Sequence, residues 1–215
     1  MPSLTVIRPI LWLFPVLIFA VQGCAERKQF DALPPDAVVL AFGDSVTAGI
    51  GAEAGYDYPS QLGESTGLKV VNAGVSGDTA REAAGRLAPL LASHQPQLVI
   101  IELGGNDFLR QTQAARVKAF LRDIIREALA SGSAVALVAV PRLSLLRASV
   151  GALTDSPIYA ELAEEEGVVL VPDIFSEVLS DGSLRADEIH PNARGYRQLA
   201  EGIRGVLIAR GLLTD

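Results

Sequence analysis

The sequence predicts an α/β fold in which helices cover both faces of one five-stranded parallel sheet. Five short apolar runs of strand length alternate along the chain with longer segments of helical period. This alternation is typical of βαβ units, in which successive strands run parallel. With 215 residues, the chain is also long enough to form one domain with a core of its own.

The predicted strands are apolar runs bounded by glycine or by polar residues. They cover residues 38–42, 68–71, 98–101, 134–140 and 168–171. The predicted helices cover residues 58–66, 79–93, 114–130, 158–166 and 193–210. Thr79 and Glu82 form a capping box at the start of the second helix, and Pro89 predicts a kink or break within it. Residues 142–156 have weak periodicity and are predicted to form a long surface loop.

The N-terminus has the pattern of an export signal. Arg8 precedes the apolar run 10–21, which is shorter than the ~20 residues that span a membrane but suits the apolar region of a signal peptide. The run ends in Val21-Gln22-Gly23-Cys24, which resembles a bacterial lipobox. We therefore expect a signal peptide over 1–23, lipidation at Cys24, a tether over 24–36 and a globular domain over 37–215. The alternatives are an ordinary cleaved signal and an uncleaved anchor.

Composition excludes several functional classes. Eighteen basic and 25 acidic residues give a net charge of −7, and no basic block suggests binding of nucleic acid. The single cysteine leaves no internal disulfide, and no Cys/His cluster predicts a metal site. We expect the protein to need no cofactor and to be a monomer. We expect it to lie in the bacterial cell envelope, facing the periplasm. Only His94 and His190 are available as histidine bases.

Polar segments follow three of the predicted strands, and a fourth precedes the last helix. They are Gly43-Asp44-Ser45, Asn72-Ala73-Gly74, Gly104-Gly105-Asn106-Asp107 and the segment from Asp187 to His190-Pro191. The carboxyl ends of parallel strands share one edge of a sheet, where ligands bind in open α/β folds. These segments are therefore predicted to form one site.

Their residue types fit acyl transfer, which needs a nucleophile, a base and donors for an oxyanion. Ser45 is the predicted nucleophile, His190 the base and Asp187 the group that orients it. The backbone N–H groups of Ser45 and Gly74 and the side-chain amide of Asn106 are the predicted oxyanion donors. Asp44 and Asp107 are predicted to orient their neighbours.

The four blocks resemble those of the GDSL-type hydrolases, or SGNH superfamily, which is named after the residues matched here by Ser45, Gly74, Asn106 and His190. Val46 replaces the leucine of the GDSL motif. The resemblance is greatest to the periplasmic branch of acyl thioesterases, arylesterases and lysophospholipases. It implies a flavodoxin-like three-layer α/β/α sandwich and metal-free hydrolysis of a small acyl ester, thioester or lysophospholipid through an acyl-serine.

Two alternatives to this function remain. One is a carbohydrate O-acetylesterase of the same superfamily, which would have a shallow polar pocket instead of an aliphatic groove near Phe108, Leu109 and residues 142–154. The other is a lipoprotein of the envelope that binds a ligand without catalysis.

Overall fold

The computed structural model describes Met1 and residues 30–141 and 153–214. Its five strands form one parallel sheet in the order β2-β1-β3-β4-β5, the flavodoxin-like order. They are β1 (Val38–Gly43), β2 (Lys69–Gly74), β3 (Leu98–Glu102), β4 (Ala134–Val138) and β5 (Val169–Val171). The predicted five-stranded parallel sheet is confirmed.

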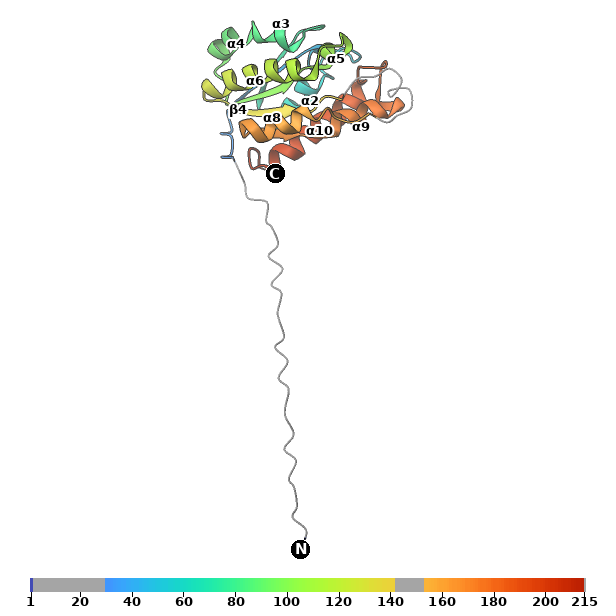
Figure 1. Cartoon of the computed structure of the whole chain (residues 1–215). Helices are drawn as coiled ribbons and strands as arrows, with labels where there is room; N and C mark the ends of the chain where they lie inside the picture. Colours follow the sequence, from blue (N-terminus) through green and yellow to red (C-terminus); the bar gives the residue numbers. More distant parts are fainter. Residues whose placement is uncertain (2–29, 142–152, 215) are drawn as a thin grey trace.

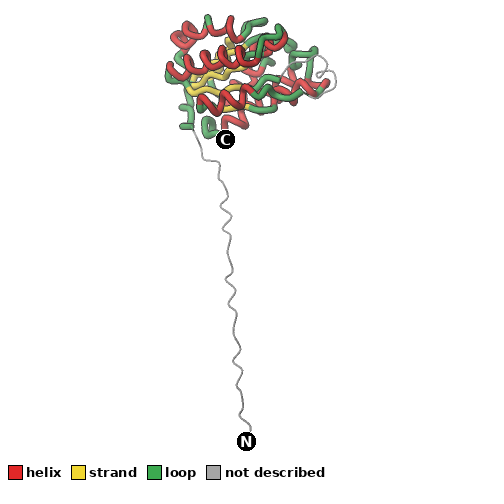
Figure 2. Tube along the Cα trace, viewed as in Figure 1, coloured by secondary structure: helices red, strands yellow, loops and turns green. Residues whose placement is uncertain are grey.

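Helices cover the sheet in two layers (Figures 1 and 2). The layer around α6 contains α3, α4 and α8, and the layer around α10 contains α2 and α9. Their bounds are α2 (Tyr58–Thr66), α3 (Ala80–Ala84), α4 (Leu87–His94), α6 (Ala114–Ala130), α8 (Ile158–Glu166), α9 (Ile174–Ser180) and α10 (Ala193–Ala209). Two short helices, α1 (Ser45–Ala48) and α5 (Gly105–Leu109), directly follow strands, and a 3₁₀ turn covers Gly182–Leu184.

The core forms where the central strands meet the apolar stripes of the long helices. Every residue of β3 is buried, as is all of β1 after its first residue, because helices cover both faces. Each stripe recurs at helical spacing, with Val117, Leu121 and Ile124 on α6 as the example. Truncating one such buried aliphatic side chain to alanine typically costs about 2–5 kcal/mol. This packing fixes the strand ends that carry the polar segments.

The break predicted within the helix over 79–93 is present, because the chain forms two helices there, but its predicted position is wrong. The break falls at Gly85 and Arg86, before Pro89. Pro89 is the third residue of α4, where its missing N–H costs nothing since the first turn of a helix has no acceptor for it. The structure also adds α9, in a segment for which the sequence predicted neither a helix nor a strand.

Part of the predicted tether belongs to the folded body. The Leu33 N–H donates to the Leu212 carbonyl oxygen at 2.9 Å, and Phe30 and Leu33 contact the core. The predicted signal peptide, Cys24 and most of the predicted loop at 142–156 lie outside the described residues. Within the described ranges, no helix has the length and apolar character needed to cross a membrane.

Candidate active site

Ser45 lies at a sharp turn between β1 and α1. Asp44 caps α1, since its Oδ1 accepts the Val46 N–H at 3.0 Å. Gly43 permits the turn, because a Cβ there would lie 1.9 Å from Thr47 Oγ1. The turn holds Ser45 at the carboxyl edge of the sheet, with only 8% of its surface exposed.

His190 and Asp187 reach Ser45 from the loop before α10. His190 Nε2 lies 3.0 Å from Ser45 Oγ, and His190 Nδ1 lies 2.8 Å from Asp187 Oδ2. Asp187 Oδ1 accepts the backbone N–H groups of Ile189 and His190, at 2.9 and 2.8 Å. Partial burial alone would raise the pKa of Asp187, but the bonds from His190 and these N–H groups lower it. The carboxylate is therefore held ionised against the imidazole.

Asn106 approaches the same point from α5. Its Nδ2 donates to Asp44 Oδ2 and to the Asp78 carbonyl oxygen, both at 3.0 Å. Asp107 Oδ2 accepts the Ala80 N–H at 2.8 Å and so fixes the start of α3. Asp44 thus contacts Asn106 directly, whereas Asp107 acts on the neighbouring helix.

The expectation for Gly74 needs correction. Its N–H already donates to Asn72 Oδ1 at 3.0 Å, so this donor is not free for an oxyanion. A Cβ at Gly74 would lie 2.2 Å from the Ala48 nitrogen. The glycine is required because β2 and α1 approach each other closely at this point.

Gly77, which the sequence analysis did not select, has the features expected of a donor. It has φ +87° in the loop between β2 and α3, and no described acceptor receives its N–H. Its carbonyl oxygen accepts a bond from Arg110 at 2.9 Å. The next residue, Asp78, binds Asn106 through its carbonyl oxygen. The sequence signal was present in Gly77-Asp78, directly before the capping box.

Arg86 is a second residue that the sequence analysis missed. Its guanidinium donates to Asp78 Oδ2 and to the carbonyl oxygens of Ala73 and Gly43, each at 2.7 Å. It also lies 4.3 Å from the centroid of the Phe42 ring. One side chain therefore ties the ends of β1 and β2 to the loop that holds Asn106.

Two buried acids, Asp44 and Glu102, line the hollow at Ser45. Burial raises the pKa of Asp44 to about 6, although the Val46 N–H, His190 and Asn106 oppose the shift. Glu102 lies at the end of β3 and accepts the Thr47 hydroxyl at 3.1 Å. Burial and the nearby Asp44 charge raise its pKa well above the usual range. Asp44 therefore ionises near pH 6, and Glu102 gives up its proton less readily than an ordinary carboxyl group.

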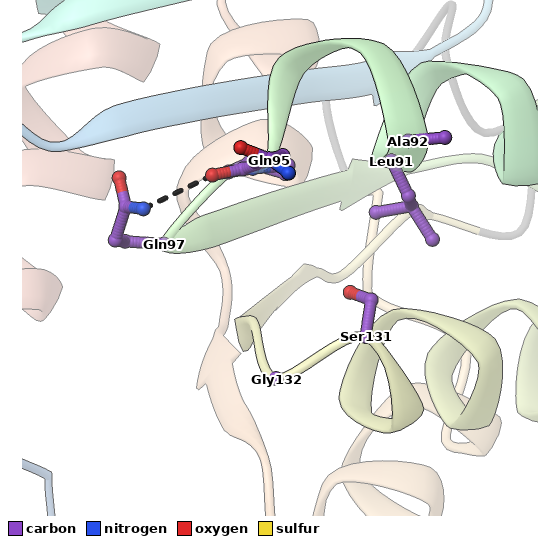
Figure 3. Close-up of a pocket in the computed structure, with 7 residues that line it drawn as sticks. Leu91, Ala92, Gln95, Gln97, Ser131 and Gly132 are labelled. Carbon is purple, nitrogen blue, oxygen red and sulfur yellow. Dashed lines mark hydrogen bonds between the residues drawn. The ribbon is translucent and has the colours of Figure 1, made fainter.

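The hollow at Ser45 is small, about 20 Å³, and several of its walls are apolar. Leu109, Phe175 and Ile189 line it together with Ser45, Asn106 and His190. A larger hollow of about 430 Å³ lies near the amino ends of β3 and β4 (Figure 3). Gln95, Gln97, Ser131 and Gly132 are among its lining residues, and none of those residues is acidic, basic or histidine. Among the described residues, no cluster of three or more His, Cys, Asp or Glu side chains could hold a metal ion.

A hydrogen-bond chain from a serine through a histidine to an aspartate, at the carboxyl edge of a flavodoxin-like sheet, is the arrangement expected of a serine hydrolase. The profile of the GDSL-like Lipase/Acylhydrolase family matches residues 41–198. The chain belongs to this family and is a serine ester hydrolase.

Named relatives agree with this assignment. The chain is 38% identical over 160 residues to thioesterase 1/protease 1/lysophospholipase L1 of Escherichia coli K12, covering 72% of this chain and 75% of that protein. It is 33% identical over 191 residues to esterase TesA of Pseudomonas aeruginosa, covering 85% and 93%. A crystal structure of TesA superimposes with a TM-score of 0.71 at 30% identity, covering 80% of this chain and 99% of that one.

Proposed function

We propose that the chain hydrolyses acyl esters and thioesters through a Ser45–His190–Asp187 triad and an acyl-serine intermediate. The observation that carries the proposal is the unbroken chain of contacts from Ser45 Oγ through the imidazole to Asp187, at 3.0 and 2.8 Å. Ser45 Oγ attacks the acyl carbon while His190 Nε2 takes its proton. His190 returns the proton to the leaving alcohol or thiol, and water then attacks the acyl-serine with His190 again as base.

The oxyanion is stabilised by the N–H groups of Ser45 and Gly77 and by the Asn106 amide. Gly77 takes the role predicted for Gly74, because its N–H is free of described acceptors. Both amide protons of Asn106 are directed at protein oxygens, Asp44 Oδ2 and the Asp78 carbonyl. One of the two N–H groups therefore donates to the oxyanion as well as to its protein acceptor, in a three-centre hydrogen bond, as negative charge develops on the substrate oxygen. Removing one such donor typically costs ~10²–10³ in turnover.

The substrates are of the arylesterase, acyl thioesterase and lysophospholipase type. The apolar walls formed by Leu109, Phe175 and Ile189 favour aliphatic or aryl acyl groups over an acetylated sugar. This lining argues against the carbohydrate O-acetylesterase alternative. The intact hydrogen-bond chain argues against a binding protein without catalysis.

The decisive experiment measures hydrolysis of p-nitrophenyl butyrate by wild type, Ser45→Ala and Ser93→Ala. Ser93 is an exposed serine on α4 and serves as the matched control. We expect Ser45→Ala to lose activity while its urea unfolding curve stays close to wild type, and Ser93→Ala to keep both. Undiminished hydrolysis by Ser45→Ala would refute the mechanism. A wild type inactive on short- and medium-chain esters and thioesters would favour the binding protein.

The enzyme is further proposed to be an envelope lipoprotein, cleaved after residue 23 and lipidated at Cys24. The lipobox-like Val21-Gln22-Gly23-Cys24 supports this. Labelling of cells with a radioactive fatty acid tests it. Wild type should carry the label and Cys24→Ala should not, whereas an unlabelled wild type that is still exported would indicate an ordinary signal peptide.

A further inference from the structure

A third hollow, of about 380 Å³, is lined by Arg110, which donates to the Gly77 carbonyl oxygen beside the catalytic site at 2.9 Å. Asn106 lines the hollow at Ser45, and the following residue, Asp107, lines this one. The lining comes from the start of α3, the end of α5 and the first turn of α6. These helices lie in the same part of the molecule (Figure 1).

Three arginines line this hollow: Arg81, Arg110 and Arg116. Its two acids do not neutralise them all. Glu82 pairs with Arg110 at 3.2 Å and caps the N-terminus of α3, and buried Asp107 is turned to the Ala80 N–H. In the described part of the chain, neither Arg81 nor Arg116 has a carboxylate within ion-pair distance.

The rest of α6 shows a different arrangement. Lys118, Arg122 and Arg126, which follow Arg116 on the same helix, all pair with glutamates of α8. The basic side chains away from the hollow are thus neutralised locally, whereas Arg116 and Arg81 remain available at the hollow. Thr112 adds a hydroxyl group to the same lining, whereas the Thr79 hydroxyl already donates to Glu82 Oε2 at 2.7 Å. Guanidinium forks beside hydroxyl donors suit the oxygens of a phosphate group.

We propose that this hollow is a subsite for a phosphate carried by the leaving group of the substrate. The proposal rests on the ester and thioester hydrolysis proposed above and specifies its substrates further. The bond from Arg110 to Gly77 links this hollow to the proposed oxyanion loop, and Arg81 and Arg116 would be the ligands of the phosphate. Two kinds of substrate present this chemistry: an acyl-coenzyme A thioester and a lysophospholipid.

Arg110 connects this subsite with the oxyanion loop. It donates to Glu82 on the side of the hollow and to the Gly77 carbonyl oxygen at 2.9 Å on the side of the loop. A phosphate bound in the hollow therefore lies next to the residue that holds the proposed Gly77 donor in place. The subsite and the oxyanion site share this part of the chain.

Two pairs of substrates test the proposal, and each pair differs by its phosphate-bearing part. The first pair is butyryl-coenzyme A and S-butyryl-N-acetylcysteamine, and the second is 1-lauroyl-lysophosphatidate and 1-monolauroylglycerol. The test variant is Arg81→Gln/Arg116→Gln. The control is Arg204→Gln/Arg210→Gln, which removes the same charge from the far end of α10, near the C-terminus.

The quantity to compare is the ratio of kcat/KM for the phosphate-bearing substrate to that for its neutral partner. We expect this ratio to fall about tenfold or more in the test variant, the loss typical of removing hydrogen bonds to a charged group, and to stay constant in the control. A fall confined to one pair identifies the source of the phosphate. Unchanged ratios in both pairs, or an equal fall in the control, would overturn the subsite. Failure of the hydrolase itself is recognised separately, because wild type would then cleave none of the four substrates.

Discussion

Replacing Arg86 with methionine should both destabilise the protein and slow turnover. The side chains of Arg86 and Asp78 are only 23% and 15% exposed, so the pair is shielded from solvent. Truncation leaves the Asp78 carboxylate without its cation and removes two charged hydrogen bonds to strand-end carbonyls. Breaking a buried pair costs about 3–5 kcal/mol, and the residual exposure reduces this to about 3 kcal/mol here.

The loss of turnover follows from the position of Asp78. Its carbonyl oxygen accepts the Asn106 amide, and the preceding Gly77 supplies the proposed N–H donor. If this segment shifts, oxyanion donors are misplaced, so kcat should fall by up to about 10²-fold, the cost of losing one donor. KM should change less than kcat, because Arg86 is not among the residues that line the hollow at Ser45.

Urea unfolding and p-nitrophenyl butyrate kinetics measure the two effects. Arg110→Met is the control for stability, because Arg110 and Glu82 are both more than half exposed and solvent screens their pair, which therefore contributes little to stability. A double-mutant cycle of Arg86→Met with Asp78→Asn should give a coupling energy of about 1 kcal/mol or more. A loss of stability no larger than that of Arg110→Met, or zero coupling, would refute the bracing role of Arg86.

Two further predictions concern the glycines and the buried acid. Gly77→Ala should lower kcat at least about tenfold, since a donor is disturbed, while the positive φ costs the fold only about 1–2 kcal/mol. Gly74→Ala should instead lose stability, because its Cβ would lie 2.2 Å from the Ala48 nitrogen. Full kcat in Gly77→Ala would contradict the donor role of Gly77, and wild-type stability in Gly74→Ala would contradict the packing role of Gly74. For Asp44, the pKa is raised from 3.8 to about 6, so the folded state binds a proton that the unfolded state releases. The protonated Asp44 carboxyl therefore stabilises the folded state at low pH. This contribution to the free energy of unfolding, about 3 kcal/mol, is lost as the pH rises, mostly between about pH 4 and 7. The difference in unfolding free energy between wild type and Asp44→Asn should decline by this amount over that range, and a constant difference would show that Asp44 has no raised pKa.

Local patterns were sufficient for most of the secondary structure. The helices at Tyr58–Thr66, Ala114–Ala130 and Ile158–Glu166 begin and end where the sequence predicts. In each of these helices, the spacing of the apolar residues and the residues that flank the segment indicate the same boundaries. The break in the segment after Thr79 was misplaced because Pro89 was its local signal, whereas the chain breaks at Arg86, which bonds to Asp78 and to strand ends that are distant in the sequence.

The residues of the site likewise fall into those that local sequence patterns predicted and those that only the fold revealed. Ser45, Asn106, Asp187 and His190 were predicted because each stands beside a strand end or in a short motif, and parallel topology gathers such ends at one edge. The role of Gly74 could not be read from the sequence, because it depends on how closely α1 approaches β2 and on the bond from its N–H to Asn72. The same applies to Arg86 and Gly77, since a hydrogen-bond partner across the fold has no fixed spacing along the chain.

The sequence by itself determined the layered α/β architecture and singled out the residues proposed here as the nucleophile, the base and its acid. These depend on periodicity and short motifs, which are local. Only the tertiary structure decided which N–H groups are free, which charges are paired and which acids are buried beside one another. Asp44 illustrates the division: its place before Ser45 is visible in the sequence, but its pKa of about 6 arises from burial among residues that folding brings together.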